Sequence, residues 1–139
     1  MKSVTNSDEG TPIGINELDN EKIILDGGSI AWMPCFIGKN CAIGNSVNIG
    51  SLAHIGAEVI IGDNCKIQGG AYIANKTQIG NNVFIGPNAT IMNDKYPPSG
   101  DSNLWQIVVV GDRAVIGGGA NLVAGVSMGD DSVLAAGAT

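Results

Sequence analysis

The sequence predicts an all-β protein, a three-sided parallel solenoid built from six-residue repeats. Three observations predict it: an aliphatic residue at every sixth position, a small or β-branched residue in the fifth place of each repeat, and turn-forming residues in the fourth. A period of six does not fit the 3.6-residue turn of an α-helix, but it places the first and fifth residues of a repeat on one side of a strand. The aliphatic positions are Leu25, Ile37, Ile43, Ile49, Ile55, Ile61, Ile67, Ile73, Ile79, Ile85 and Ile91, then Val110, Ile116, Leu122, Met128 and Leu134.

The fourth place of each repeat predicts a corner. Glycine, asparagine and aspartate tolerate the left-handed backbone that a sharp corner needs. Three corners close a triangular coil, so residues 18 apart stack about 4.8 Å from one another in parallel sheets. The corner residues of these types are Asn40, Asn64, Gly70, Asn82, Asn88, Gly119, Gly125, Asp131 and Gly137.

The repeat also defines the organisation of the chain. Residues 1–24 are acidic and polar and precede the regular pattern, so we expect an N-terminal arm or cap there. Residues 25–139 form the solenoid domain, interrupted by a loop over 93–109 that is rich in polar and turn-forming residues. Irregular loops in regular folds are enriched for function, although a purely structural excursion is the alternative.

Composition excludes several classes of protein. The chain has 139 residues, 13 acidic and 7 basic side chains and a net charge of −6, and Arg113 is its only arginine. It therefore lacks the basic surface that nucleic acids attract. No apolar run is long enough to span a membrane, and no secretion signal opens the sequence, so we expect a cytoplasmic protein. Cys35, Cys41 and Cys65 all occupy the small fifth place, which predicts packing rather than a disulfide or metal site.

The repeat of an aliphatic residue, glycine, two variable residues and a small residue resembles that of the hexapeptide acyltransferases. This resemblance implies a left-handed parallel β-helix. Residues 66–69, 84–88 and 93–99 further resemble the acetyltransferases that act on nucleotide-linked amino sugars. That family implies acetyl-coenzyme A (acetyl-CoA) as co-substrate, a homotrimer, and active sites in clefts between neighbouring subunits. It also places the loop residues in the site: Asn93, Asp94, Lys95 and Tyr96.

Three residues are candidates for catalysis. His54 is the only histidine, and its place in the repeat predicts an outward side chain near Phe36 and Tyr72, as a general base or as a packed interface residue. Asn93 is a candidate to orient the amine or to stabilise the oxyanion, and Asp94 to accept a proton. The alternative for this pair is an Asx turn that opens the loop. The loop carries no histidine, which favours acylation of an amine over acylation of a hydroxyl.

Other residues are candidates for binding. Gln68 is polar where neighbouring repeats have glycine or alanine, so it marks a substrate contact together with Lys95 and Tyr96, or it caps a corner. Arg113 is a candidate for a coenzyme phosphate or a solvated corner residue. From the resemblance, the coenzyme is expected along the coils after the loop, at Gly117, Gly118, Val123 and Ala124, although the repeat itself requires small residues there.

The leading hypothesis is an acyl-CoA dependent N-acetyltransferase without a metal. A zinc-dependent γ-type carbonic anhydrase shares the fold but needs three histidine ligands per zinc, which one histidine per chain cannot supply. The alternative is a catalytically degenerate or structural β-helix that binds no coenzyme. The absence of the basic, proline-containing tail that usually follows the last coil of this family, here after Leu134, keeps this alternative open.

Overall fold

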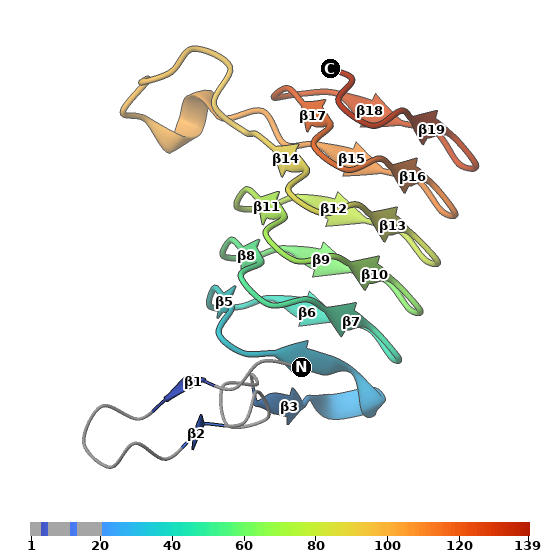
Figure 1. The fold of residues 1–139 in the computed structure, drawn as a ribbon. Helices are drawn as coiled ribbons and strands as arrows, with labels where there is room; N and C mark the ends of the chain where they lie inside the picture. The colour runs from blue at the N-terminus through green and yellow to red at the C-terminus, as the bar shows by residue number, and fades with distance from the viewer. Residues whose placement is uncertain (1–3, 6–11, 14–20) are drawn as a thin grey trace.

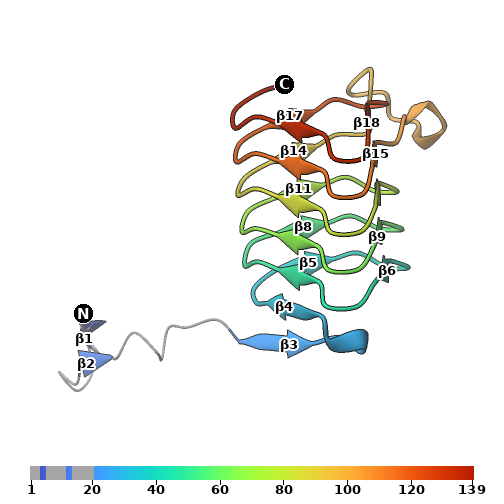
Figure 2. The same cartoon turned by 90° about the vertical axis from the view of Figure 1, so that its right-hand side faces the viewer.

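The computed structural model describes residues 4–5, 12–13 and 21–139, and residues 21–139 form a triangular column of stacked coils (Figures 1 and 2). Most of the N-terminal arm predicted over 1–24 lies outside the described residues. Its last residues, Lys22–Ile24, form strand β3 and pair antiparallel with the first coil. The other described strands of this region are β1 (Val4–Thr5) and β2 (Pro12–Ile13), which pair with each other.

Three sheets form the sides of the column. We name each face after the first of its parallel strands, which are β4, β5 and β6. The β4 face consists of β3, β4 (Ile30–Trp32), β7 (Asn48–Ile49), β10 (Lys66–Ile67), β13 (Phe84–Ile85), β16 (Val115–Ile116) and β19 (Val133–Leu134). The β5 face consists of β5 (Phe36–Ile37), β8 (His54–Ile55), β11 (Tyr72–Ile73), β14 (Thr90–Ile91) and β17 (Asn121–Leu122). The β6 face consists of β6 (Ala42–Ile43), β9 (Ile60–Ile61), β12 (Gln78–Ile79), β15 (Val109–Val110) and β18 (Ser127–Met128).

The chain visits the three faces in turn, so each six-residue repeat is one short strand and one corner. Apart from the β3–β4 pair, the strands of the three faces pair in parallel, as Ile55 with Ile73 on the β5 face. In the strands from β4 onward, the second residue points inward, and burying an isoleucine there contributes roughly 1.5–3 kcal/mol. The column of fully buried isoleucines is Ile49, Ile55, Ile61, Ile67, Ile73, Ile85, Ile91 and Ile116.

The corners confirm the prediction for the fourth place of the repeat. Every corner residue from Asn40 to Asn88, and again from Arg113 to Gly137, has a positive φ. The corner geometry also imposes this backbone on residues that rarely adopt it, because stacking in the column outweighs their local preference. These less permissive corner residues are Ser46, Leu52, Glu58, Lys76 and Arg113.

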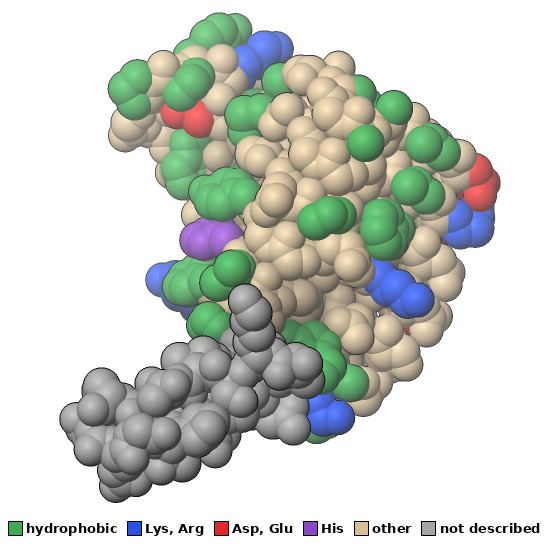
Figure 3. Space-filling view, in the orientation of Figure 1, with side chains coloured by type: hydrophobic (Ala, Val, Ile, Leu, Met, Phe, Trp, Pro, Cys, Tyr) green, Lys and Arg blue, Asp and Glu red, His purple; other side chains and the backbone are tan. Residues whose placement is uncertain are grey.

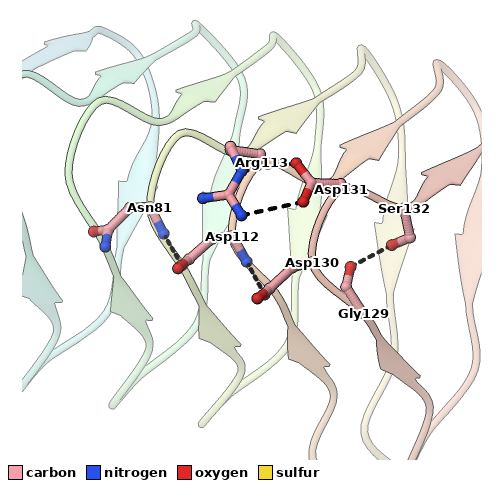
Figure 4. Close-up of polar contacts among 7 residues, drawn as sticks. All are labelled: Asn81, Asp112, Arg113, Gly129, Asp130, Asp131 and Ser132. Atoms are coloured by element: carbon pink, nitrogen blue, oxygen red, sulfur yellow. Dashed lines mark hydrogen bonds and ion pairs between the residues drawn. The ribbon is translucent and has the colours of Figure 1, made fainter.

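We number the corners by the faces they join. The first corner leads from the β4 face to the β5 face, the second from the β5 face to the β6 face, and the third from the β6 face to the β4 face. Along the third corner, side-chain oxygens accept the backbone N–H of the preceding coil at 2.8 Å, and we call this row the Asx ladder (Figure 4). Its accepting residues are Asp63, Asn81, Asp112 and Asp130.

The loop leaves the column at the second corner, after β14, and stands out from it near the last coils (Figure 1). Its neck is closed by a backbone bridge between Asp94 and Trp105 and by the Gln106 N–H, which donates to the Asn93 carbonyl at 2.8 Å. A short 3₁₀ turn, η3, spans Ser102–Leu104. The chain rejoins the column earlier than the expected end at residue 109, since Val108 is fully buried and Val109 already lies in β15.

The three cysteines pack in or against the core of the column. Cys35, Cys41 and Cys65 are free thiols, and burial raises the pKa of Cys65, whose S–H donates to the Gly80 carbonyl at 3.1 Å. Among the described residues, no helix is long and apolar enough to cross a bilayer.

Candidate functional site

The β5 face carries an outward row of side chains below the loop. Each member is the first residue of its strand, and the parallel register places it directly over the residue 18 positions earlier, as Tyr72 over His54. The row continues past β14 with a residue 31 positions later, because the loop intervenes. In order along the column, the row is Phe36, His54, Tyr72, Thr90 and Asn121.

His54 stacks between the two aromatic residues of this row. Its ring centroid lies 4.7 Å from that of Phe36, at an interplanar angle of 15°, and 4.7 Å from that of Tyr72, at 12°. The three rings form a stripe on the surface, with the half-buried imidazole in the middle (Figure 3). Within the part of the chain that the structure describes, neither ring nitrogen of His54 makes a hydrogen bond. The imidazole edge is therefore available to exchange a proton with a bound ligand.

Asp94 organises the loop. Its carboxylate accepts the Ser99 N–H at 2.9 Å and the Tyr96 N–H at 3.1 Å, which is the Asx turn that was the alternative to a catalytic role. The Ser99 N–H holds the pKa of this carboxyl below its usual range, because a hydrogen bond to the charged form favours that form. A carboxylate held in this way is a weak proton acceptor. Asn93 begins the loop at the column surface and is half-buried.

The candidates for substrate binding lie on both edges of the β5 face. Lys95 and Tyr96 are on the exposed part of the loop, at the second corner, and the Tyr96 side chain is 66% exposed. Gln68 lies at the first corner, between β10 and β11, and is half-buried. Within one chain, the width of the β5 face therefore separates Gln68 from the loop.

The candidates for coenzyme binding are divided in the same way. Gly117 and Gly118 lie at the first corner, where a Cβ built on Gly117 would be 2.3 Å from the Ala136 nitrogen, so close packing of the coils requires glycine at position 117. Val123 and Ala124 lie at the second corner beside the loop, which the Gly125 N–H ties to this corner by donating to the Gln106 carbonyl at 2.9 Å. The structure thus brings the loop next to Val123 and Ala124 but not next to the glycine pair.

Arg113 lies at the third corner, which does not border the β5 face. Its Nε donates to Asp131 Oδ1 at 2.7 Å and a second guanidinium nitrogen donates to Oδ2 at 3.1 Å (Figure 4). The ion pair lowers the pKa of Asp131 and raises that of Arg113. Both side chains are more than half exposed, so the pair is solvated as well as paired. The position matches the alternative of a solvated corner residue.

Sequence reasoning missed Trp105 and Gln106, which close the neck of the loop. Neither residue carries a signal in the sequence for this role, because Trp105 and Gln106 both close the neck through their backbone. Among the described residues, no group of three or more histidine, cysteine or acidic side chains is placed to hold a metal ion.

Two family models match the chain. The model described as bacterial transferase hexapeptide (six repeats) matches residues 34–75. The model described as hexapeptide repeat of succinyl-transferase matches residues 76–92 and 107–139, and the segment between these two ranges is the loop. No curated protein sequence matches the chain.

Solved structures share the fold. A variant of GDP-perosamine N-acetyltransferase from Caulobacter crescentus, in complex with CoA and GDP-perosamine, is 24% identical with a TM-score of 0.68, over 80% of this chain and 47% of that one. The acetyltransferase domain of PglB from Neisseria gonorrhoeae is 16% identical with a TM-score of 0.68, over 80% and 48%. LpxA from Bacteroides fragilis, a UDP-N-acetylglucosamine acyltransferase, is 27% identical with a TM-score of 0.66, over 74% and 42%.

The chain thus spans about half the length of these solved proteins or less. The two hexapeptide models, however, together match more than half of the chain, and the second of them matches on both sides of the loop. The predicted fold class, a left-handed parallel β-helix, is confirmed, and the chain belongs to the bacterial hexapeptide-repeat transferases.

Proposed function

We propose that the chain is the catalytic β-helix of an acyl-CoA dependent transferase that acetylates the amino group of a nucleotide-linked amino sugar. The observation that carries the proposal is the placement of His54, whose imidazole edge makes no hydrogen bond with the described residues and lies on the face bordered by the loop. The fold it shares with the Caulobacter enzyme, which was solved with CoA and GDP-perosamine, supports this choice of substrates.

The reaction is a thioester aminolysis. The neutral amine attacks the carbonyl carbon of acetyl-CoA, a C–N bond forms, the C–S bond breaks, and coenzyme A leaves as a thiolate. His54 accepts the proton that the amine loses and passes it to the thiolate, a role that contributes roughly 10²–10⁴-fold to a rate. The Asn93 side-chain amide donates a hydrogen bond to the developing oxyanion.

Asp94 has a different part in this mechanism. Both of its oxygens already accept backbone N–H groups of the loop, and its lowered pKa disfavours the protonated form. We therefore assign Asp94 to the ordering of the loop. The shape that it gives the loop presents Lys95 and Tyr96, which contact the sugar nucleotide.

The proposed site lies between subunits of a homotrimer. Phe36 and Tyr72 leave 53% and 45% of their surfaces exposed on the β5 face, and exposed aromatic side chains are typical of subunit contacts. A neighbouring subunit would also unite the two edges that one chain separates, with Gln68 and Gly117 on one side and the loop on the other. Because Arg113 does not border the β5 face of its own chain, the Arg113 that contacts a coenzyme phosphate would come from the neighbouring subunit.

The proposed compartment is the cytoplasm. Cys35, Cys41 and Cys65 are all unpaired. Free thiols persist in reducing compartments, whereas oxidising ones favour disulfides.

Calorimetric titration with acetyl-CoA and with coenzyme A tests the proposal, together with light scattering to give the mass of the assembly. We expect a trimer that binds the coenzyme with micromolar affinity and then transfers acetyl to a nucleotide-linked amino sugar, followed by mass spectrometry. The absence of binding at millimolar coenzyme would overturn the proposal in favour of a degenerate or structural β-helix.

A further inference from the structure

The orientation of the His54 ring has no polar explanation. A catalytic histidine is usually oriented by a hydrogen bond from one ring nitrogen to a carboxylate or carbonyl group. Among the described residues, no such acceptor meets either nitrogen of His54. The contacts that hold the ring are the stacked rings of Phe36 and Tyr72, one on each face.

We propose that Phe36 and Tyr72 are positioning residues that clamp the His54 imidazole between them and fix the plane in which it exchanges a proton. The inference rests on the proposed function of His54 as the base. The clamp follows from strand register, because β5, β8 and β11 pair with these three residues aligned, and the ring separation of 4.7 Å matches the spacing of neighbouring strands.

The clamp restricts how a substrate can approach. Both faces of the imidazole are covered, so only its edge meets solvent, and hydrogen bonds to ring nitrogens lie in the ring plane. Rotation of the ring out of this plane would break both stacks. The amine must therefore approach along the plane of the imidazole, which is the alignment that makes proton transfer efficient.

The outward row offers no charged partner that would hold the ring in another way. The strands β5 and β11 pair with the strand of His54, and their outward residues are Phe36 and Tyr72. The next strand, β14, has Thr90 at this position. The Tyr72 phenol is the one other titratable group among these side chains. Stacking is thus the interaction in the row that can orient the imidazole.

The β4 face provides a matched control. Phe84 occupies the equivalent outward position of β13, but its neighbours in register are Lys66 and Val115. It is half-buried like His54 and stacks on no ring in the described part of the chain. Phe84→Leu therefore removes an aromatic ring from the same kind of position without touching the clamp.

The experiment compares Phe36→Leu, Tyr72→Leu, Tyr72→Phe and Phe84→Leu, all in the intact trimer. His54 is the sole histidine, so its ring protons give unambiguous NMR signals. In Phe36→Leu and Tyr72→Leu, we expect these signals to move downfield as ring currents are lost, and kcat to fall roughly 10- to 100-fold, with KM unchanged. Tyr72→Phe keeps the aromatic ring and should keep kcat at the wild-type value. Phe84→Leu should change neither the His54 ring-proton signals nor kcat.

Two results would contradict the proposal in distinguishable ways. Unchanged kcat in Phe36→Leu and Tyr72→Leu, where His54→Gln is inactive, would overturn the clamp and leave the proposed function standing. Full activity in His54→Gln would overturn the role of His54 as the base, and the clamp with it. Circular dichroism shows whether the coils of each variant are intact, which the exposure of Phe36 and Tyr72 within one chain leads us to expect. Light scattering shows whether each variant keeps the mass of the wild-type assembly, because Phe36 and Tyr72 also lie at the proposed subunit contact, and only variants that keep it are compared.

Discussion

The third corner and the β5 face are made from the same six-residue repeat, yet they use their polar groups in opposite ways. At the third corner, each residue of the Asx ladder accepts a backbone N–H of the coil before it, and Arg113 is paired with Asp131. On the β5 face, His54 stacks on its neighbours through both faces of its ring, and its ring nitrogens make no hydrogen bond among the described residues. The polar groups of the corner therefore help to stabilise the column, whereas the imidazole edge of His54 on the β5 face stays without a partner among the described residues.

The largest expected effect is at a corner where two coils touch. Gly86→Ala puts a Cβ 2.4 Å from the Gly118 nitrogen and 2.7 Å from the Gly117 carbonyl carbon, and backbone atoms cannot move aside cheaply. We expect a loss of roughly 1–3 kcal/mol in the free energy of unfolding, measured by urea denaturation. Gly129→Ala is the matched control, because a Cβ there meets no atom within 4 Å. Equal losses in the two variants would contradict the assignment of stability to coil contacts.

A smaller effect is expected in the Asx ladder. Asn81→Ala removes the acceptor of the Asp63 N–H, a hydrogen bond of 2.8 Å, and should lower the free energy of unfolding by about 0.5–1.5 kcal/mol. The control is Asn48→Ala, at an outward position of β7 where the side chain makes no hydrogen bond within the described chain. If Asn48→Ala destabilised the protein as much, the ladder would have no special part in stability.

The loop should respond to pH through Asp94. The folded-state pKa is lowered, so the carboxylate stabilises the loop at pH values above the ordinary aspartate range, and this contribution is lost as the pH falls through the lowered value. We expect the Ser99 amide to stay protected from hydrogen exchange until acid pH in the wild type. In Asp94→Asn, that protection should be weaker throughout and should lack the acid transition. Identical pH dependence in both proteins would show that another group orders the loop.

The smallest effect is expected at the Arg113–Asp131 pair. Both side chains are solvated, and salt screens exposed ion pairs. Arg113→Gln should lower the denaturation midpoint slightly at low ionic strength and not at all at about 1 M salt, where the Debye length is about 3 Å. A large loss that persists at high salt would mean that Arg113 supports the corner in some other way.

Most of the fold was predictable because the solenoid repeats one local rule. The period of six identified inward isoleucines such as Ile67 and corners such as Asn82 without knowledge of any contact. It also implied corners at Leu52 and Lys76, whose side chains alone would not suggest a positive φ. The return of the loop was less predictable, because the apolar run from Ile107 to Val110 fits the column in more than one register.

The candidate site was only partly predictable. Position in the repeat placed His54 in a row with Phe36 and Tyr72, because residues 18 apart must stack. The sequence could not decide between a catalytic Asp94 and an Asx turn, since both use the same carboxylate, and the Asx turn becomes visible only in the hydrogen bonds of the loop. Likewise, the pairing of Arg113 with Asp131 depends on side-chain rotamers that a period does not specify.

The most direct test of the central claim is the rate of acetyl transfer from acetyl-CoA to a nucleotide-linked amino sugar, compared between the wild type, His54→Gln and Asn48→Ala. We expect kcat/KM to fall roughly 100-fold or more in His54→Gln, with an unchanged thermal midpoint, and to stay at the wild-type value in Asn48→Ala. Wild-type transfer by His54→Gln would contradict the claim that the free imidazole of the β5 face is the base.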